Sequence, residues 1–244
     1  MDQELEVYLI LRDSLTNSSP PSRKIVKLVE NGRIINKENV NQTDENHQTI
    51  LFRVLQNQKT CSPAIVSFLL EKGALVSINK DTVGIPEQIA LHVTIQNVTD
   101  YSLDIVKILA TDSPTVNTEG LLWTAPLEKA VVIKHKSAPE IVRLLLEKGA
   151  DINRANPRNE RTPLDYAVGN EHESALEIVQ LLLEKGAHIT NKDVWDEKTP
   201  VHHAAKNLHQ YSLEIICLLI EEGAAINQTN WKGKTPSLCS SKQK

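Results

Sequence analysis

The segment Gly233-Lys234-Thr235 resembles the end of a phosphate-binding loop, in which backbone N–H groups and a lysine hold the phosphates of a nucleotide. That loop requires a glycine at position 228, where this chain has Gln228. Pro236 would also disrupt the helix that follows such a loop. We therefore expect no nucleotide site here, and the sequence predicts no cofactor.

Histidines cluster at His202, His203 and His209, and imidazole is a common metal ligand. No cysteine or carboxylate stands near them at a spacing that would complete a zinc site. Cys61 and Cys239 have no histidine or asparagine arranged in the sequence to activate a nucleophile. We therefore expect neither a metal site nor an enzyme.

The residues best suited to recognising another molecule are tryptophans. Trp195 and Trp231 each stand four positions before the threonine of a Thr-Pro pair. Exposed tryptophan is uncommon, and aromatic residues dominate the energetics of protein interfaces. The alternative is that each ring lies flat on the next link of the chain and only stiffens it. With their neighbours, which lean basic, the candidate partner-binding residues are Trp195, Trp231, Arg158, Asn159, Arg161, Asp196, Lys198 and Lys232.

An internal repeat must position these residues. The segment E-I-V-R-L-L-L-E-K-G-A-D-I-N at 140–153 recurs in similar form at 177–190 and 214–227, at intervals of about 37 residues. Thr-Pro pairs at 162–163, 199–200 and 235–236, which are eroded in the earlier units, can begin a first helix, with threonine as the N-cap. The apolar segment forms a second helix, which a glycine ends. Because no unit could bury its apolar surface alone, the units must stack.

The best-preserved motifs are T-P-L-D-Y-A at 162–167 and T-P-V-H-H-A-A at 199–205, each followed by a leucine-rich helix and Gly-Ala. With these motifs the chain resembles the ankyrin-repeat family over essentially its whole length. The resemblance implies an all-α ankyrin-repeat solenoid. It also implies that the links between repeats are hairpin fingers, with Trp195 and Trp231 pointing outward into a groove. In this family the histidine at the position of His202 ties neighbouring fingers together.

We expect residues 1–239 to form a single domain of about six helix-turn-helix repeats, each of about 37 residues, with residues 240–244 as a disordered tail. The predicted repeats span approximately 1–40, 41–80, 81–116, 117–153, 154–190 and 191–227, and a truncated repeat covers 228–239. The family's common period is about 33 residues, and the surplus here falls between the two helices of a repeat. It either lengthens the first helix or enlarges the connecting loop.

Composition narrows the possible partners and compartment. The formal net charge of -4 leaves no basic surplus to neutralise phosphates, so we expect no nucleic-acid partner. No apolar run approaches the roughly 20 residues of a membrane span, and the first residues do not resemble a signal peptide. The 3 widely spaced cysteines are typical of a reducing compartment. We expect an intracellular protein, cytoplasmic or alternatively nuclear, without a membrane partner.

The expected function is a non-catalytic protein-protein interaction module that binds a protein partner on its concave, finger-side surface. The alternative is an adaptor or effector that blocks or redirects a host signalling complex. Its basis is that irregular repeats containing asparagine and lysine resemble those of large DNA viruses and intracellular bacteria. We expect a monomer, or weak self-association through the C-terminal end, where the last second helix would be only partly covered.

Overall fold

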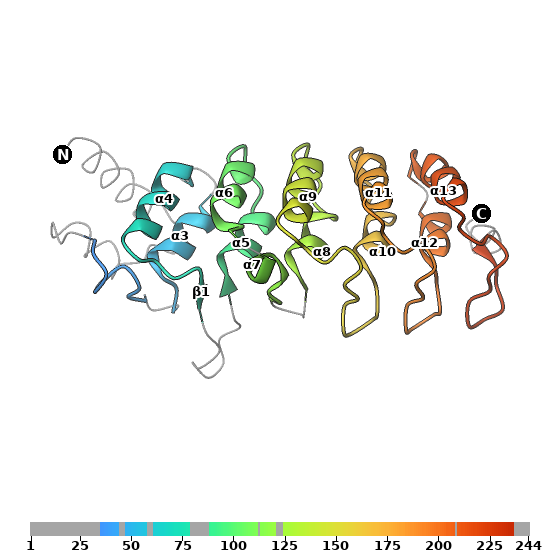
Figure 1. The fold of residues 1–244 in the computed structure, drawn as a ribbon, viewed down its shortest axis with the longest axis horizontal. Coiled ribbons are helices and arrows are strands. Elements are labelled where there is room, and N and C mark those ends of the chain that lie inside the picture. The colour runs from blue at the N-terminus through green and yellow to red at the C-terminus, as the bar shows by residue number, and fades with distance from the viewer. Residues whose placement is uncertain are drawn as a thin grey trace. The chain divides into compact units, whose positions relative to one another are not determined.

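The computed structural model describes residues 35–43, 47–57, 61–78, 88–111, 113–120, 124–207 and 209–236 (Figure 1). Internal contacts divide the chain into two compact units, residues 1–111 and 112–244. The predicted first helix of the N-terminal repeat and the predicted tail at 240–244 lie outside the described residues. The single domain expected for 1–239 and its repeat boundaries stay predictions.

The first unit contains two helix-turn-helix pairs. The two first helices contact each other, as do the two second helices. Two-residue strands between the pairs form an antiparallel ladder, with Ser77 opposite Ile89 and Ile78 opposite Gln88. The elements are α3 (Ile50–Gln56), α4 (Pro63–Glu71), β1 (Ser77–Ile78), β2 (Gln88–Ile89), α5 (Ala90–Gln96) and α6 (Ser102–Leu109).

The second unit stacks three helix pairs in two rows. The first helices α8, α10 and α12 contact one another in succession, and so do the second helices α9, α11 and α13 (Figure 1). The elements are α7 (Ser113–Asn117), α8 (Pro126–Ala130), α9 (Ala138–Glu147), α10 (Pro163–Ala167), α11 (Ala175–Glu184), α12 (Pro200–Lys206) and α13 (Ser212–Glu221). The all-α class is confirmed, and the short helix α7 lies in the link between α6 and α8, where the family resemblance implied a hairpin finger.

Helix ends in the second unit follow the capping chemistry of the Thr-Pro and Gly-Ala motifs. Thr162 is extended at the N-cap of α10, and its N–H donates to the Asp165 carboxylate at 2.9 Å. Thr199 is the extended N-cap of α12, with proline at the first helical position. After α11 and α13 come Gly186 and Gly223 with φ of +89° and +94°, a conformation that a side chain would strain.

The surplus residues of each repeat enlarge the loop between its two helices. The first helices are short, with 5 residues in α10 and 7 in α12. Residues 168–174 separate α10 from α11, and residues 207–211 separate α12 from α13. The alternative of a longer first helix is therefore excluded for these repeats.

Asparagines join these enlarged loops from one repeat to the next. Asn170 Nδ2 donates to the carbonyl oxygens of Val131 and Ile133 at 3.0 and 3.4 Å. One repeat later, Asn207 Nδ2 donates to the Val168 carbonyl oxygen at 3.1 Å. Carbonyl groups left free at the end of a first helix thus receive a donor from the following repeat.

Candidate partner-binding surface

Three loops of the second unit precede the Thr-Pro motifs, and we call them finger A (156–161), finger B (193–198) and finger C (230–234). Finger A is closed by a 2.9 Å hydrogen bond from Asn156 N to Arg161 O, and the other two are closed in the same way. The first side chain of each finger is buried: Asn156, Asp193 and Asn230. Each accepts a hydrogen bond from a backbone N–H within its own finger. A polar residue at the base therefore holds each loop in shape.

Backbone hydrogen bonds also connect one finger to the next. Val194 N donates to Asn159 O at 3.1 Å, and Trp231 N donates to Asp196 O at 3.1 Å. Trp231 therefore takes the backbone position of Val194 rather than that of Trp195. Counting back from the Thr-Pro threonine makes the two tryptophans equivalent. The backbone does not, because finger C is one residue shorter than finger B.

Each of the two tryptophans forms one hydrogen bond through its indole N–H and exposes most of its surface to solvent. Trp195 is 71% exposed, and its Nε1 donates to Arg158 O at 3.2 Å. Trp231 is 56% exposed, and its Nε1 donates to Asp196 Oδ1 at 2.8 Å. Each indole thus bonds to the preceding finger and still presents most of its surface to solvent.

Charged side chains surround the indoles. Lys232 Nζ lies 4.7 Å from the centre of the Trp231 ring, within the range of a cation–π contact. Lys198 forms an ion pair with Asp196. Hydrogen bonds from Lys198 and Trp231 hold the pKa of Asp196 below its ordinary value. Arg158 is exposed at the tip of finger A.

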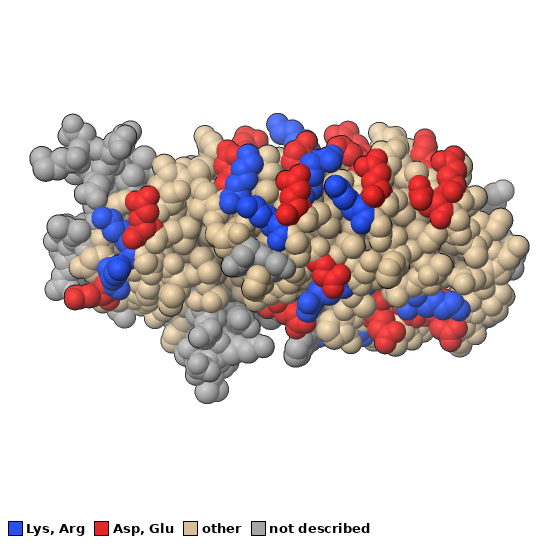
Figure 2. All heavy atoms as spheres, in the orientation of Figure 1, with Lys and Arg blue, Asp and Glu red and all other residues tan. Residues whose placement is uncertain are grey.

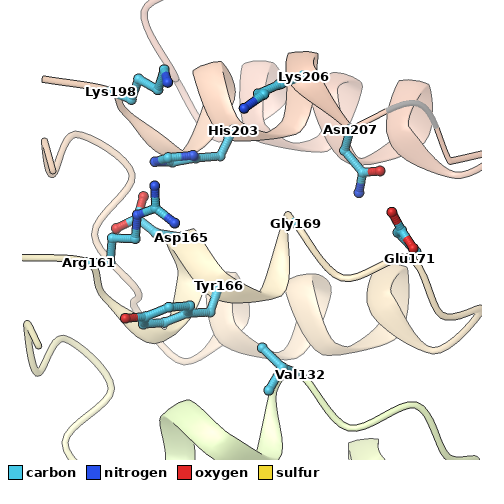
Figure 3. A pocket seen from close by; sticks show the side chains of 10 residues that line it. All are labelled: Val132, Arg161, Asp165, Tyr166, Gly169, Glu171, Lys198, His203, Lys206 and Asn207. Carbon is cyan, nitrogen blue, oxygen red and sulfur yellow. The ribbon is translucent and has the colours of Figure 1, made fainter. Parts of the chain in front are cut away.

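A pocket of about 380 Å³ lies beneath the fingers, between α10 and α12. Figure 3 shows the Arg161 guanidinium beside the His203 ring, with Lys206 on α12 and Tyr166 on the opposite wall. Arg161 and Lys198 come from the fingers and the other residues from the first helices and the loops after them. The lining residues are Val132, Arg161, Asp165, Tyr166, Gly169, Glu171, Lys198, His203, Lys206 and Asn207.

A buried carboxylate lies beside two of the residues that line this pocket. The Asp193 side chain is fully buried, and its Oδ2 lies 3.2 Å from Arg161 Nη2 and 3.0 Å from His203 Nε2. Burial lowers the pKa of His203 to about 4, and the positive charge of Arg161 acts in the same direction. Burial raises the pKa of Asp165 to about 6, against hydrogen bonds from Thr162. At pH 7 His203 is therefore neutral and Asp165 is mostly ionised.

His202 links finger C to α12. Its Nδ1 lies 3.3 Å from Thr199 N and 2.8 Å from Thr199 Oγ1, and its Nε2 lies 3.1 Å from Lys234 O. Because Nδ1 accepts the Thr199 N–H, the proton must be on Nε2, which donates to the carbonyl oxygen. The tie that the family resemblance implied for His202 is thus present, and it joins Thr199, directly after finger B, to finger C.

The structure places every predicted site residue on a finger. Arg158, Asn159 and Arg161 lie on finger A, Trp195, Asp196 and Lys198 on finger B, and Trp231 and Lys232 on finger C. Sequence reasoning missed Asp193, Tyr166, His203 and Lys206. A usable signal existed for two of these, because Tyr166 and His203 both stand four positions after a Thr-Pro threonine.

Some arrangements have no counterpart in the part of the chain that the structure describes. Among those residues, no group of three or more His, Cys, Asp or Glu side chains could hold a metal ion. No helix in the described segments is long and apolar enough to cross a membrane.

Comparison with known proteins agrees with this architecture. A family model described as ankyrin repeats (3 copies) matches residues 91–193, and the single ankyrin-repeat model matches residues 196–231. Among solved structures, the crystal structure of the human ASB11 ankyrin repeat domain superposes with a TM-score of 0.63. It shares 21% identity, and the match covers 94% of this chain and 89% of that chain. At this identity the likeness shows the fold alone.

A search of curated protein sequences found no match. The fold therefore rests on the repeat models, the superposition and the stacked helix pairs, which agree with one another. Domains of this kind are generally protein-interaction modules and are typically non-catalytic. The chain belongs to the ankyrin-repeat family.

Proposed function

We propose that this protein is a non-catalytic interaction module whose protein partner docks on fingers A to C and on the pocket beneath them. The observation that carries this proposal is the pair of indoles that are 71% and 56% exposed while their N–H groups are already bonded to the preceding finger. Tryptophan is enriched among residues that dominate binding energy. Rings held in place before binding lose little conformational entropy when a partner covers them.

The surroundings of the indoles support a mixed apolar and polar interface. A partner's apolar side chains would cover the faces of Trp195 and Trp231, while Arg158 and Lys232 would form part of the rim. The pocket between α10 and α12 is large enough for a partner's side chain and offers the Lys206 ammonium group, which has no ion-pair partner in the described structure. Apolar anchors with a polar rim are the usual anatomy of a protein interface.

Affinity capture from cell extracts followed by quantitative mass spectrometry tests the proposal. The baits are the wild type, the double variant Trp195→Ala/Trp231→Ala, and a control variant Tyr101→Ala. Tyr101 is an exposed aromatic residue of the first unit and lies outside the fingers. Loss of two hot-spot residues should weaken capture by at least about 30-fold.

The control should capture the same protein as the wild type does. Equal capture by the double tryptophan variant would exclude the finger surface. The identity of the captured protein would also decide whether the chain regulates its own cell or acts as the adaptor or effector considered above.

A further inference from the structure

The last second helix of the second unit has an apolar face that its counterpart in the preceding repeat does not show. In α11, against which α13 packs, Val179 is 0% exposed. The equivalent residue of α13, Ile216, is only half-buried. The described part of the chain therefore leaves this side of α13 open.

The open side carries an apolar stripe at helical spacing. Leu213 is 73% exposed and Ile220 is 43% exposed, and the Cys217 thiol is free and exposed. With Ile216 these residues occupy positions i, i+3, i+4 and i+7, which form one face of a helix. We call the four residues the α13 end face. Large contiguous exposed apolar patches usually mark interaction sites.

The sequence of α13 departs from the earlier repeats at the positions around this stripe. Arg143 of α9 corresponds to Gln180 of α11 and to Cys217 of α13, so a charged residue becomes polar and then apolar. The residue that directly follows each second helix is lysine after α9 and after α11, but Glu222 after α13. The last repeat thus replaces cationic and polar groups by apolar and acidic ones.

Acidic side chains flank the α13 end face. Glu214, Glu221 and Glu222 are exposed, and α13 contains no lysine or arginine. Within the described residues none of the three glutamates takes part in an ion pair. Figure 2 shows acidic side chains over α13 with no basic ones among them. The patch is therefore apolar at its centre and negative at its edge.

We propose that the α13 end face is a docking surface for an amphipathic helix of a partner protein that carries lysine or arginine beside its apolar stripe. The packing of α13 on α11 is the template, since a helix with apolar residues at positions like those of Ile215 and Leu219 covers such a face. Basic flanks would meet the three glutamates, and complementary charges at an interface rim fix orientation and exclude wrong partners.

Charge also argues against a second copy of this chain as the occupant. Two α13 helices placed face to face would bring six glutamates together with no cation from either helix. Like charges opposed across an interface disfavour association. The α13 end face is distinct from fingers A to C, so this proposal does not depend on the function proposed above.

Three fluorescently labelled, helix-stapled peptides test the proposal by anisotropy titration against the full chain. The first has a leucine stripe at i, i+3, i+4 and i+7 with lysine at the flanks. The second has the same stripe with glutamate flanks, and the third has lysine flanks with the stripe scrambled. The first peptide should bind at least about tenfold more tightly than the other two at moderate ionic strength.

Variants of the chain locate the binding. Leu213→Ser/Ile220→Ser should weaken the lysine-flanked peptide by about tenfold or more, because it removes the two most exposed apolar side chains. Glu214→Gln/Glu221→Gln/Glu222→Gln should abolish the preference for lysine over glutamate flanks. Val132→Ser, at another exposed apolar residue, and Trp195→Ala/Trp231→Ala should leave binding unchanged.

Several outcomes would overturn the proposal. These are equal binding of the lysine- and glutamate-flanked peptides, no binding of either, and binding that survives Leu213→Ser/Ile220→Ser. A fourth such outcome would come from sedimentation velocity. A wild-type dimer that this double variant converts to a monomer would assign the end face to a second copy of the chain.

Discussion

His203 and Asp165 line the same pocket, and burial moves their pKa values in opposite directions. The pKa of His203 falls from 6.5 to about 4, and that of Asp165 rises from 3.8 to about 6. Since one pKa unit corresponds to about 1.4 kcal/mol, each group contributes about 3 kcal/mol to the pH dependence of folding.

The two contributions have opposite signs between pH 6 and 4. As the pH falls below 6.5, the unfolded chain protonates His203 before the folded chain does. The free energy of unfolding therefore decreases until the pH reaches about 4, the pKa in the folded state. Below about pH 6 the folded chain protonates Asp165 before the unfolded chain does. The free energy of unfolding therefore increases as the pH falls to about 3.8, the ordinary pKa of the group. In the wild type the two slopes largely cancel.

Substituting either residue should expose the pH dependence of stability that the other one contributes. Relative to the wild type, Asp165→Asn should lose about 3 kcal/mol of additional stability between pH 7 and pH 4, because only the His203 slope remains. His203→Gln should gain a similar amount over the same range. Urea denaturation followed by tryptophan fluorescence at several pH values measures both. Subtracting the wild-type curve removes the shared contributions of other groups, such as the raised pKa of Glu128. Curves for the two variants that run parallel to the wild type would refute the opposed shifts.

Three further substitutions test the scaffold and the fingers. Leu182 is fully buried in α11, so Leu182→Ala should cost about 2–5 kcal/mol, and an unchanged melting temperature would contradict the proposed helix register. Asn170→Ala leaves the Val131 and Ile133 carbonyl oxygens without their donor and should cost about 1–3 kcal/mol in urea denaturation, whereas no loss would show that the ladder of loops adds no stability. Trp195→Phe/Trp231→Phe keeps aromatic surface but removes both indole donors, so amide hydrogen exchange in fingers B and C should accelerate. Exchange at wild-type rates would show that these hydrogen bonds do not hold the fingers.

Local motifs were enough to predict much of the scaffold. Thr-Pro predicted the starts of α10 and α12, because threonine caps the first turn and proline suits the first helical position. The glycine after each leucine-rich segment marked the left-handed residue that ends α11 and α13. The repeat pattern also correctly predicted that all eight candidate site residues lie on neighbouring fingers. These features depend on a few consecutive residues, which is why sequence reasoning reached them.

Most features that depend on residues from different repeats were not predicted, and the tie from His202 to finger C was implied only by the family resemblance. Arg161, Asp193 and His203 come together from finger A, finger B and α12, so no local pattern in the chain marks them. The enlarged loop was chosen over a longer helix only by the observed helix ends and by the long-range hydrogen bonds of Asn170. Counting from Thr-Pro made Trp231 equivalent to Trp195, but its backbone hydrogen bond places it at the position of Val194 because finger C is one residue shorter than finger B.

The central claim is that a protein partner covers fingers A to C. Amide hydrogen exchange by mass spectrometry, with the captured partner present and absent, tests it most directly. The account predicts slower exchange in residues 156–161, 193–198 and 230–234 of the complex, with α9 and α11 unchanged. Slower exchange confined to the second helices, with the three fingers exchanging at the same rate in both states, would contradict it.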